Sequence, residues 1–243
     1  MHDSIGGFIW YELMTSDADA AARFYGRVIG WTIGPAAKAA AGTADYRMIE
    51  RADGGFAGGV LQLTSDMVSQ GAHPTWLGYL CVADVDDSVR AIVADGGRVL
   101  MPRTDLPVGA IAMVTDPLGQ PFYVMAPIPP AGKPEAKSDV FDPTAAQRVR
   151  WNELASPDLA RAKSFYAKHF GFAFNESMPM GAAGDYCFID LGGQRLGAIM
   201  QRSADAPVGS WLFYFGVASI RAAHAAIEAG GGRVVNGPHE VPG

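Results

Sequence analysis

The stretch WYELMTSD at residues 10–17 decides the fold, because the chain repeats it as WNELASPD at residues 151–158. Short apolar and glycine motifs continue the match in the same order: Phe24-Tyr25 with Phe165-Tyr166, Gly30 with Gly171, WLGY (76–79) with WLFY (211–214), and GGRV (96–99) with GGRV (231–234). A series of matches in one order indicates a tandem duplication of one structural unit.

Each half holds a weaker duplication of its own, a strand followed by an amphipathic helix. Asp17 and Asp84 precede segments with apolar residues at helical spacing, which end at Gly30 and Gly96. Asp accepts hydrogen bonds from the free N–H groups of a helix start, and glycine permits the left-handed turn that ends it. Short β segments follow the helices: 46–49, 59–63, 98–101, 110–115 and 121–125. The pattern predicts an α+β fold in which a βαβββ module occurs four times.

The modules pair into two predicted domains, at residues 1–127 and 148–243. Residues 128–147 are rich in Pro, Ala and charge and lack an apolar period, which is typical of a linker. The final residues 241–243 match part of LPVG at 106–109. The counterparts of residues 110–127 are therefore absent. We expect the second domain to lack its C-terminal strands and the native protein to be longer.

Composition excludes several classes of protein. The chain is 49% hydrophobic and 18% charged, which is typical of a folded globular protein. Its net charge of −6 is spread without long runs of one sign, which argues against nucleic acid or an anionic membrane as a partner. No secretory signal or membrane-length apolar stretch occurs. We expect a cytoplasmic protein that binds a small molecule, as a monomer or a homodimer.

The repeated motifs resemble the vicinal oxygen chelate superfamily of glyoxalase I, bleomycin-resistance proteins and extradiol dioxygenases. The resemblance rests on the strand-Asp-Phe-Tyr-Gly pattern in both halves, the helix start at Asp84, and the turn Asp116-Pro-Leu-Gly119. It is greatest to two-domain glyoxalase-like proteins. It implies that each module pair curls its sheet into a cup with helices outside. In the family, the cup holds a divalent metal that chelates two adjacent oxygens of a substrate.

The resemblance also implies where metal ligands would lie. The family places a His in the opening strand of a module and a carboxylate after the Asp-Pro-x-Gly turn. The residues at these positions are Trp10, Leu77, Trp151, Leu212 and Tyr123. Trp and Leu cannot ligate a metal, and a neutral phenol is a poor ligand. We therefore expect no metal and no other cofactor.

Alternation along the strands predicts what lines the cups, because side chains two apart share a face. If Trp10 points inward, Glu12 does too, and the module pairing sets Glu12 opposite Tyr79 and Glu153 opposite Tyr214. We expect at least one of the two glutamates to accept a hydrogen bond from a tyrosine. The predicted ligand-contacting residues are Trp10, Glu12, Tyr46, Met48, Tyr79, Met113 and Tyr123 in the first cup, and Trp151, Glu153, Tyr186, Phe188 and Tyr214 in the second.

Two alternatives stay open at this level. A slip of one residue would turn both glutamates to solvent, and the tryptophans would then only fill the core. For function, the loss of metal-ligand positions favours a metal-free cup that binds an aromatic or hydroxylated molecule. The alternative is a metal-dependent enzyme of the lactoylglutathione lyase or dioxygenase type. The sequence does not decide whether the protein is an enzyme.

Overall fold

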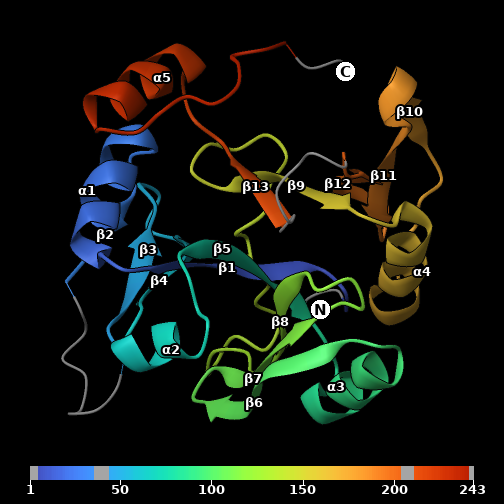
Figure 1. Cartoon of the computed structure of the whole chain (residues 1–243). Helices are drawn as coiled ribbons and strands as arrows, with labels where there is room; N and C mark the ends of the chain where they lie inside the picture. The colour runs from blue at the N-terminus through green and yellow to red at the C-terminus, as the bar shows by residue number, and fades with distance from the viewer. Residues whose placement is uncertain (1–4, 36–43, 204–210, 241–243) are drawn as a thin grey trace.

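The computed structural model describes residues 5–35, 44–203 and 211–240, which form a mixed α+β fold with two open sheets (Figure 1). The first module contains β1 (Phe8–Thr15), α1 (Ala18–Val28), β2 (Thr32–Ile33), β3 (Tyr46–Glu50) and β4 (Phe56–Gln62). The second contains β5 (Thr75–Cys81), α3 (Val85–Ala94), β6 (Arg98–Leu106), β7 (Gly109–Thr115) and β8 (Pro121–Pro127). A short helix that the sequence did not predict, α2 (Ser65–Ser69), joins the two modules.

The second half begins with the same module. It contains β9 (Val149–Ser156), α4 (Leu159–Phe170), β10 (Ser177–Pro179), β11 (Asp185–Leu191) and β12 (Gln194–Gln201). The described part of the fourth module consists of β13 (Trp211–Phe215) and α5 (Ile220–Ala229). The sequence match at residues 241–243 lies outside the described residues.

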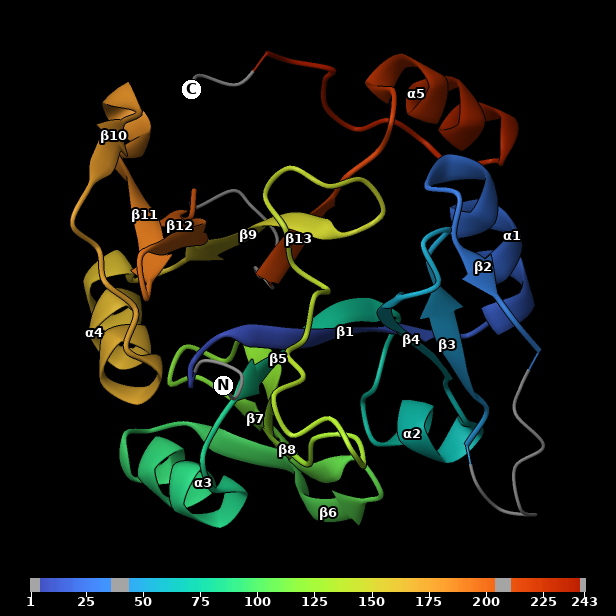
Figure 2. The ribbon, with the colours of Figure 1, turned by 180° about the vertical axis from the view of Figure 1, so that it is seen from behind.

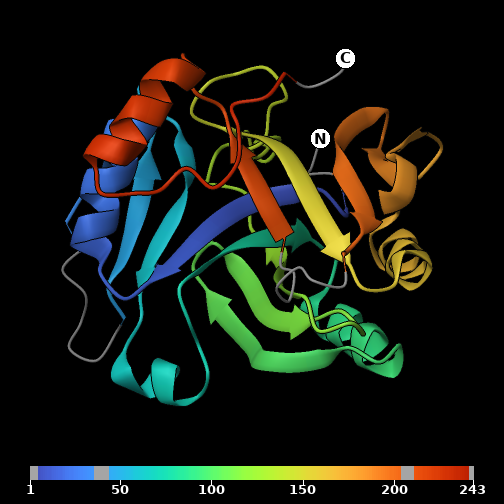
Figure 3. The ribbon, with the colours of Figure 1, turned by 45° about the horizontal axis from the view of Figure 1, so that its top comes forward.

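The strand order of the second sheet matches that of the first five strands of the first sheet. The first runs β2-β3-β4-β1-β5-β8-β7-β6 and the second β10-β11-β12-β9-β13. In each sheet the opening strand of one module lies antiparallel to that of its partner module, β1 beside β5 and β9 beside β13 (Figure 3). The predicted tandem of paired βαβββ modules is confirmed.

Acidic side chains begin three of the long helices, as the sequence predicts. Asp17, Asp84 and Asp158 each accept a hydrogen bond from the backbone N–H three residues ahead, at 2.8 to 2.9 Å. Such a bond satisfies one of the donors left free at a helix start. The remaining long helix, α5, begins with Ser219 in the same role. None of the described helices combines the length and apolarity needed to cross a bilayer.

The two halves share one hydrophobic core. Phe8 on β1 packs edge-on against Trp211, with ring centroids 5.3 Å apart, and also contacts Phe172 and Phe213. Tyr11 donates a buried hydrogen bond of 2.8 Å to Asn152, the residue at its own position in the repeat. Helix α1 lies beside α5 (Figure 1). The halves are therefore bound by buried aromatic contacts, which are the largest apolar contributions available to a core.

The repeated Trp and Phe-Tyr motifs have a structural role. Trp76 on β5 donates to the hydroxyl of Tyr25 on α1 at 2.9 Å, and Trp211 on β13 donates to Tyr166 on α4 at 3.1 Å. Each bond ties the helix of one module to the opening strand of its partner. A buried indole N–H needs such an acceptor, which explains why both motifs recur together.

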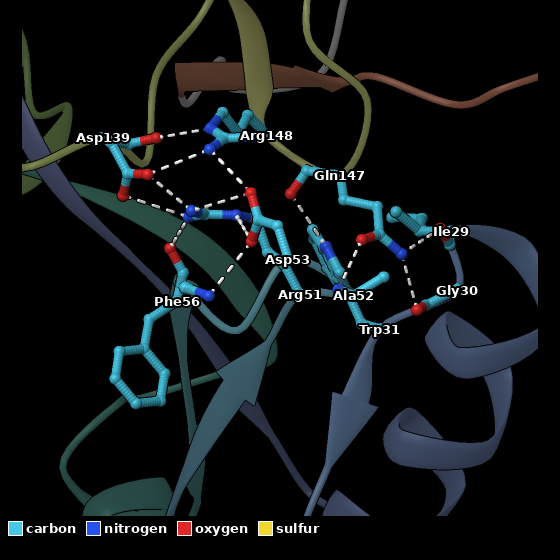
Figure 4. A network of polar contacts seen from close by, with 11 residues as sticks. Ile29, Gly30, Trp31, Arg51, Ala52, Asp53, Phe56, Asp139, Gln147 and Arg148 are labelled. Carbon is cyan, nitrogen blue, oxygen red and sulfur yellow. Dashed lines mark hydrogen bonds and ion pairs between the residues drawn. The ribbon is translucent and has the colours of Figure 1, made fainter.

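The end of the segment predicted as a linker forms ion pairs and hydrogen bonds with the first half. Figure 2 shows the connection between β8 and β9 passing from one sheet to the other. Buried Arg51 pairs with Asp139 at 2.5 Å and Asp53 at 3.1 Å, and Arg148 bonds the same two carboxylates (Figure 4). Beside this network, Gln147 donates to the carbonyl of Gly30 at 2.6 Å.

Candidate functional site

Glu12 lies on β1 in the middle of the first sheet, between Gly59 of β4 and Leu77 of β5. The hydroxyl of Tyr79 donates to Glu12 Oε2 at 2.7 Å, so the expected hydrogen bond is present. The expected pairing is wrong in one detail, because the residue directly opposite Glu12 is Leu77 and Tyr79 pairs with Trp10. Tyr79 reaches the carboxylate diagonally, which aromatic side chains are long enough to do.

Three tyrosines from three strands surround this carboxylate, which is only 2% exposed. The ring of Tyr79 stacks on that of Tyr123 from β8, with centroids 4.2 Å apart. Tyr46 reaches in from β3, and its hydroxyl accepts a hydrogen bond of 2.8 Å from Trp10 Nε1. Four predicted residues, Trp10, Tyr46, Tyr79 and Tyr123, therefore gather around the fifth, Glu12.

Burial dominates the electrostatics of the cluster. It raises the pKa of Glu12, and the hydroxyls of Tyr79, Tyr123 and Tyr46 lower it only in part. Burial, reinforced by the negative charge of Glu12, raises the pKa of Tyr46 and of Tyr79 well above 10. The phenols therefore stay neutral in the physiological range and act as hydrogen-bond donors.

Apolar and thioether side chains form the wall around the cluster. The buried members are Ile9, Met14, Leu63, Leu77, Tyr79, Cys81, Ile111 and Tyr123, and partly buried Trp10, Leu61, Met67, Ala72, Met101, Met113 and Met125 pack against them. The predicted residue Met113 thus belongs to the wall, whereas Met48 is exposed and lies outside it. Unbranched methionines adapt their shape easily, so this wall can yield to a ligand.

Gly59 on β4 leaves the space that the Tyr46 ring occupies. The sequence analysis did not predict this role. A Cβ atom at Gly59 would lie 2.1 Å from the Tyr46 hydroxyl oxygen. The phenol therefore rests directly on bare backbone. The sequence signal was a glycine at the start of the predicted strand 59–63, because glycine in a strand often marks a close approach of this kind.

The second sheet repeats the arrangement with a different donor. Trp151 donates to the hydroxyl of Tyr186 at 2.7 Å, and Tyr186 donates to Glu153 Oε2 at 2.6 Å. Phe188 packs edge-on against both rings. Tyr214 is 44% exposed and pairs with Trp151 across the strands; burial, then the charge of Glu153, raises its pKa to about 12.

The first cup does not fit a metal ion of the kind the family uses. Its oxygen donors are Glu12 and neutral phenols, and Trp10 and Leu77 occupy the strand positions where the family has ligands. Nowhere in the described parts of the chain do three or more His, Cys, Asp or Glu side chains come together to hold a metal. One carboxylate with neutral phenols is an incomplete donor set both for zinc, which takes four ligands, and for manganese, which takes an octahedral set of oxygens.

Two surface hollows lie away from both cups. One of about 260 Å³ lies between α3 and α4 and includes Asp87 and His169, and another of about 360 Å³ lies between α1 and the glycines after α5. The first is lined by helix residues and the second by residues of α1, the end of β1 and the glycines after α5. The Glu12 cluster is instead filled by its own side chains, so a ligand there must displace part of the wall.

Comparison with known proteins identifies the family. Residues 148–243 match the glyoxalase/bleomycin resistance protein/dioxygenase superfamily, and residues 10–125 match the glyoxalase-like domain. The chain therefore belongs to this superfamily, with one such domain in each half.

Two curated relatives span both halves or much of them. The putative glyoxylase CFP32 of Mycobacterium tuberculosis is 28% identical over 236 residues, covering 96% of this chain and 85% of the relative. The anthracycline biosynthesis protein DauV of a Streptomyces species is 27% identical over 179 residues, covering 69% of this chain and 62% of the relative.

Solved structures share the fold. The Mn(II)-bound glyoxalase from Novosphingobium aromaticivorans superposes with a TM-score of 0.57 at 16% identity, over 94% of this chain and 72% of that one. The halotolerant catechol dioxygenase BphC gives a TM-score of 0.55 at 17% identity, over 93% and 76%. At such identities the likeness concerns the fold alone.

Burial of Glu12 predicts an unusual dependence of stability on pH. Its pKa is raised in the folded state, so its favourable contribution is complete below the unfolded pKa and is lost as pH rises through the folded one. We expect Glu12→Gln to stabilise the protein by about 1 to 3 kcal/mol at pH 8 and hardly at all at pH 4. Urea denaturation at both pH values measures this. A variant less stable than the parent at pH 8 would refute the prediction.

Proposed function

We propose that the first cup binds a small, flat, aromatic or hydroxylated molecule without a metal. The observation that carries the proposal is the carboxylate of Glu12, buried at the centre of three tyrosine hydroxyls and an indole. A buried carboxylate is costly unless each of its oxygens has a partner, and one oxygen of Glu12 has none. Ligand sites characteristically combine apolar walls with a few polar groups that converge on one point.

The cluster offers a defined chemistry to such a molecule. Glu12 accepts a hydrogen bond from the ligand or takes up a proton as a base, and the tyrosine hydroxyls donate to ligand oxygens. Rings of Trp10, Tyr79 and Tyr123 supply flat apolar surface. The second cup, with Glu153 and Tyr186, is a further candidate site of the same kind.

The alternative function is a metal-dependent enzyme of the lactoylglutathione lyase or dioxygenase type. The superposition on a Mn(II)-bound glyoxalase favours it. The residues at the ligand positions, above all Trp10 and Leu77, argue against it.

Calorimetric titration of the full chain in the presence of EDTA tests the proposal. The probes are three flat molecules: catechol, 2-naphthol and 1-naphthylmethylammonium. We expect at least one to bind saturably, and Glu12→Gln to weaken that binding by about tenfold or more, equivalent to about 1.4 kcal/mol. Glu50→Gln, the same change at an exposed position on β3, is the matched control and should bind like the parent. Absence of binding by all three probes, or binding indifferent to Glu12→Gln, would contradict the proposal.

A further inference from the structure

One oxygen of Glu12 has no partner. Among the described residues, the buried side-chain atoms without a hydrogen bond are Glu12 Oε1 and Gln120 Oε1. The Gln120 atom belongs to a neutral amide, whereas Glu12 Oε1 belongs to an ionisable group at the centre of the cup. An unsatisfied buried carboxylate oxygen costs more than a neutral one, because both its hydrogen bonds and its charge solvation are lost.

A second buried carboxylate shows what a satisfied one looks like in this fold. Asp116, equally buried, accepts hydrogen bonds of 2.8 and 2.9 Å on Oδ1 from the backbone N–H groups of Leu118 and Gln120. Its Oδ2 accepts from Tyr166 at 3.3 Å. Both oxygens of Asp116 are thus occupied within the chain, so its burial points to no ligand. Glu12 has a partner on Oε2 alone.

Glu12 also lacks a positively charged partner among the described residues. Asp53 and Asp139 pair with arginines, and Asp95 pairs with Lys168 and His169. No ion pair of the described residues includes Glu12, and its pKa is shifted by tyrosines and burial alone. In a site of low dielectric, an uncompensated carboxylate attracts a cation far more strongly than it would in water.

We infer that the first cup takes an organic ammonium ion, a protonated amine on a flat apolar body, whose N–H donates to Glu12 Oε1. This inference rests on the proposed function and narrows its ligand class. A ligand hydroxyl would supply the missing hydrogen bond but leave the charge unmatched, whereas an ammonium supplies both. The rings of Tyr79, Tyr123 and Trp10 add attraction, since aromatic faces bind cations.

The ammonium ion can reach the carboxylate from the side covered by thioethers. Met67 of the short helix α2 packs against the wall, yet no residue of α2 is buried, so this cover is held by few contacts. Trp10 and Tyr46 are half-buried on the same face. Loosely packed segments open at low cost, and methionine side chains refill the space that they leave.

The affinity for an ammonium ion should decrease as the pH is lowered. The titratable groups that face Glu12 are Tyr46 on β3, Tyr79 on β5 and Tyr123 on β8, all of which stay neutral, and Cys81 lies further along β5 in the same wall. Only the ionised carboxylate attracts a cation, so affinity should fall as acid protonates Glu12. A ligand that needed a protonated Glu12 as donor would show the opposite trend.

The test compares two probes of one shape, 1-naphthylmethylammonium and 1-naphthylmethanol, by calorimetric titration of the full chain between pH 5 and pH 8. We expect the ammonium to bind at least about tenfold more tightly at pH 8 and to lose affinity toward pH 5. Glu12→Gln should remove both the preference and the pH dependence, and Glu50→Gln should keep both. Circular dichroism and denaturation of each variant establish that it is folded.

Each outcome is decisive. An alcohol that binds as tightly as the ammonium, with binding weakened by Glu12→Gln, overturns the ammonium inference but leaves the proposed function standing. An ammonium preference that survives Glu12→Gln places the cation elsewhere and also overturns the inference. Failure of both probes in this titration overturns it too, and failure of catechol and 2-naphthol as well removes the proposed function itself.

Discussion

Alanine at Gly197 is expected to lower the free energy of unfolding by at least about 3 kcal/mol. A Cβ atom there would lie 1.8 Å from the carbonyl oxygen of Asn152, on the parallel neighbour β9. The obstacle is backbone, so no side-chain rotation relieves it. Gly58 has the same place in the first sheet, with a Cβ 2.1 Å from the carbonyl oxygen of Tyr11 and a φ of 154°.

Urea denaturation followed by tryptophan fluorescence measures the effect of Gly197→Ala. Gly34→Ala is the matched control, because a Cβ at Gly34 meets no atom within 4 Å. We expect the control to differ from the parent by less than about 0.5 kcal/mol. A Gly197→Ala protein as stable as the control would show that β9 and β12 do not approach each other as described.

Phe8→Ala should cost about 3 to 5 kcal/mol, because it removes a buried ring that joins the two halves. For a chain of this size the melting temperature should fall by about 6 to 20 °C. The surrounding rings of Trp211 and Phe213 cannot fill the space by small movements, since they are themselves held in the core. Scanning calorimetry should show a single transition in the parent and in the variant.

Phe56→Ala provides the control for Phe8→Ala, since Phe56 is 40% exposed on β4 of the same sheet. It should change the melting temperature by a small fraction of the Phe8→Ala effect. Two separate transitions, of which Phe8→Ala moved only one, would mean that the halves unfold independently. That result would contradict the shared core.

Features with a local cause could be predicted from the sequence. The starts of α1, α3 and α4 depend on an Asp and the few backbone N–H groups ahead of it, so the sequence around Asp17 suffices. The inward position of Glu12 follows from alternation within one strand. The internal repeat predicted how the modules pair, because two copies of one motif are expected to occupy equivalent positions in the fold.

Features that depend on contacts distant in sequence could not be predicted. In the register of β1 and β5, Leu77 lies opposite Glu12 and Tyr79 lies opposite Trp10, so Tyr79 reaches Glu12 on the diagonal. The donor to Glu153 is Tyr186, which approaches from β11, a strand two places away in the sheet. Likewise, the close contact between the Tyr46 ring and Gly59 depends on how β3 packs beside β4. No periodicity in the sequence predicts that contact.

We propose that the first cup binds its ligand through Glu12 and tyrosines instead of a metal. The most direct measurement is the metal content, by inductively coupled plasma mass spectrometry, of protein purified without chelator. We expect no stoichiometric Zn, Ni, Mn or Fe, because Trp10, Leu77 and Tyr123 occupy the ligand positions of the family. About one equivalent of a tightly held transition metal per cup would contradict it.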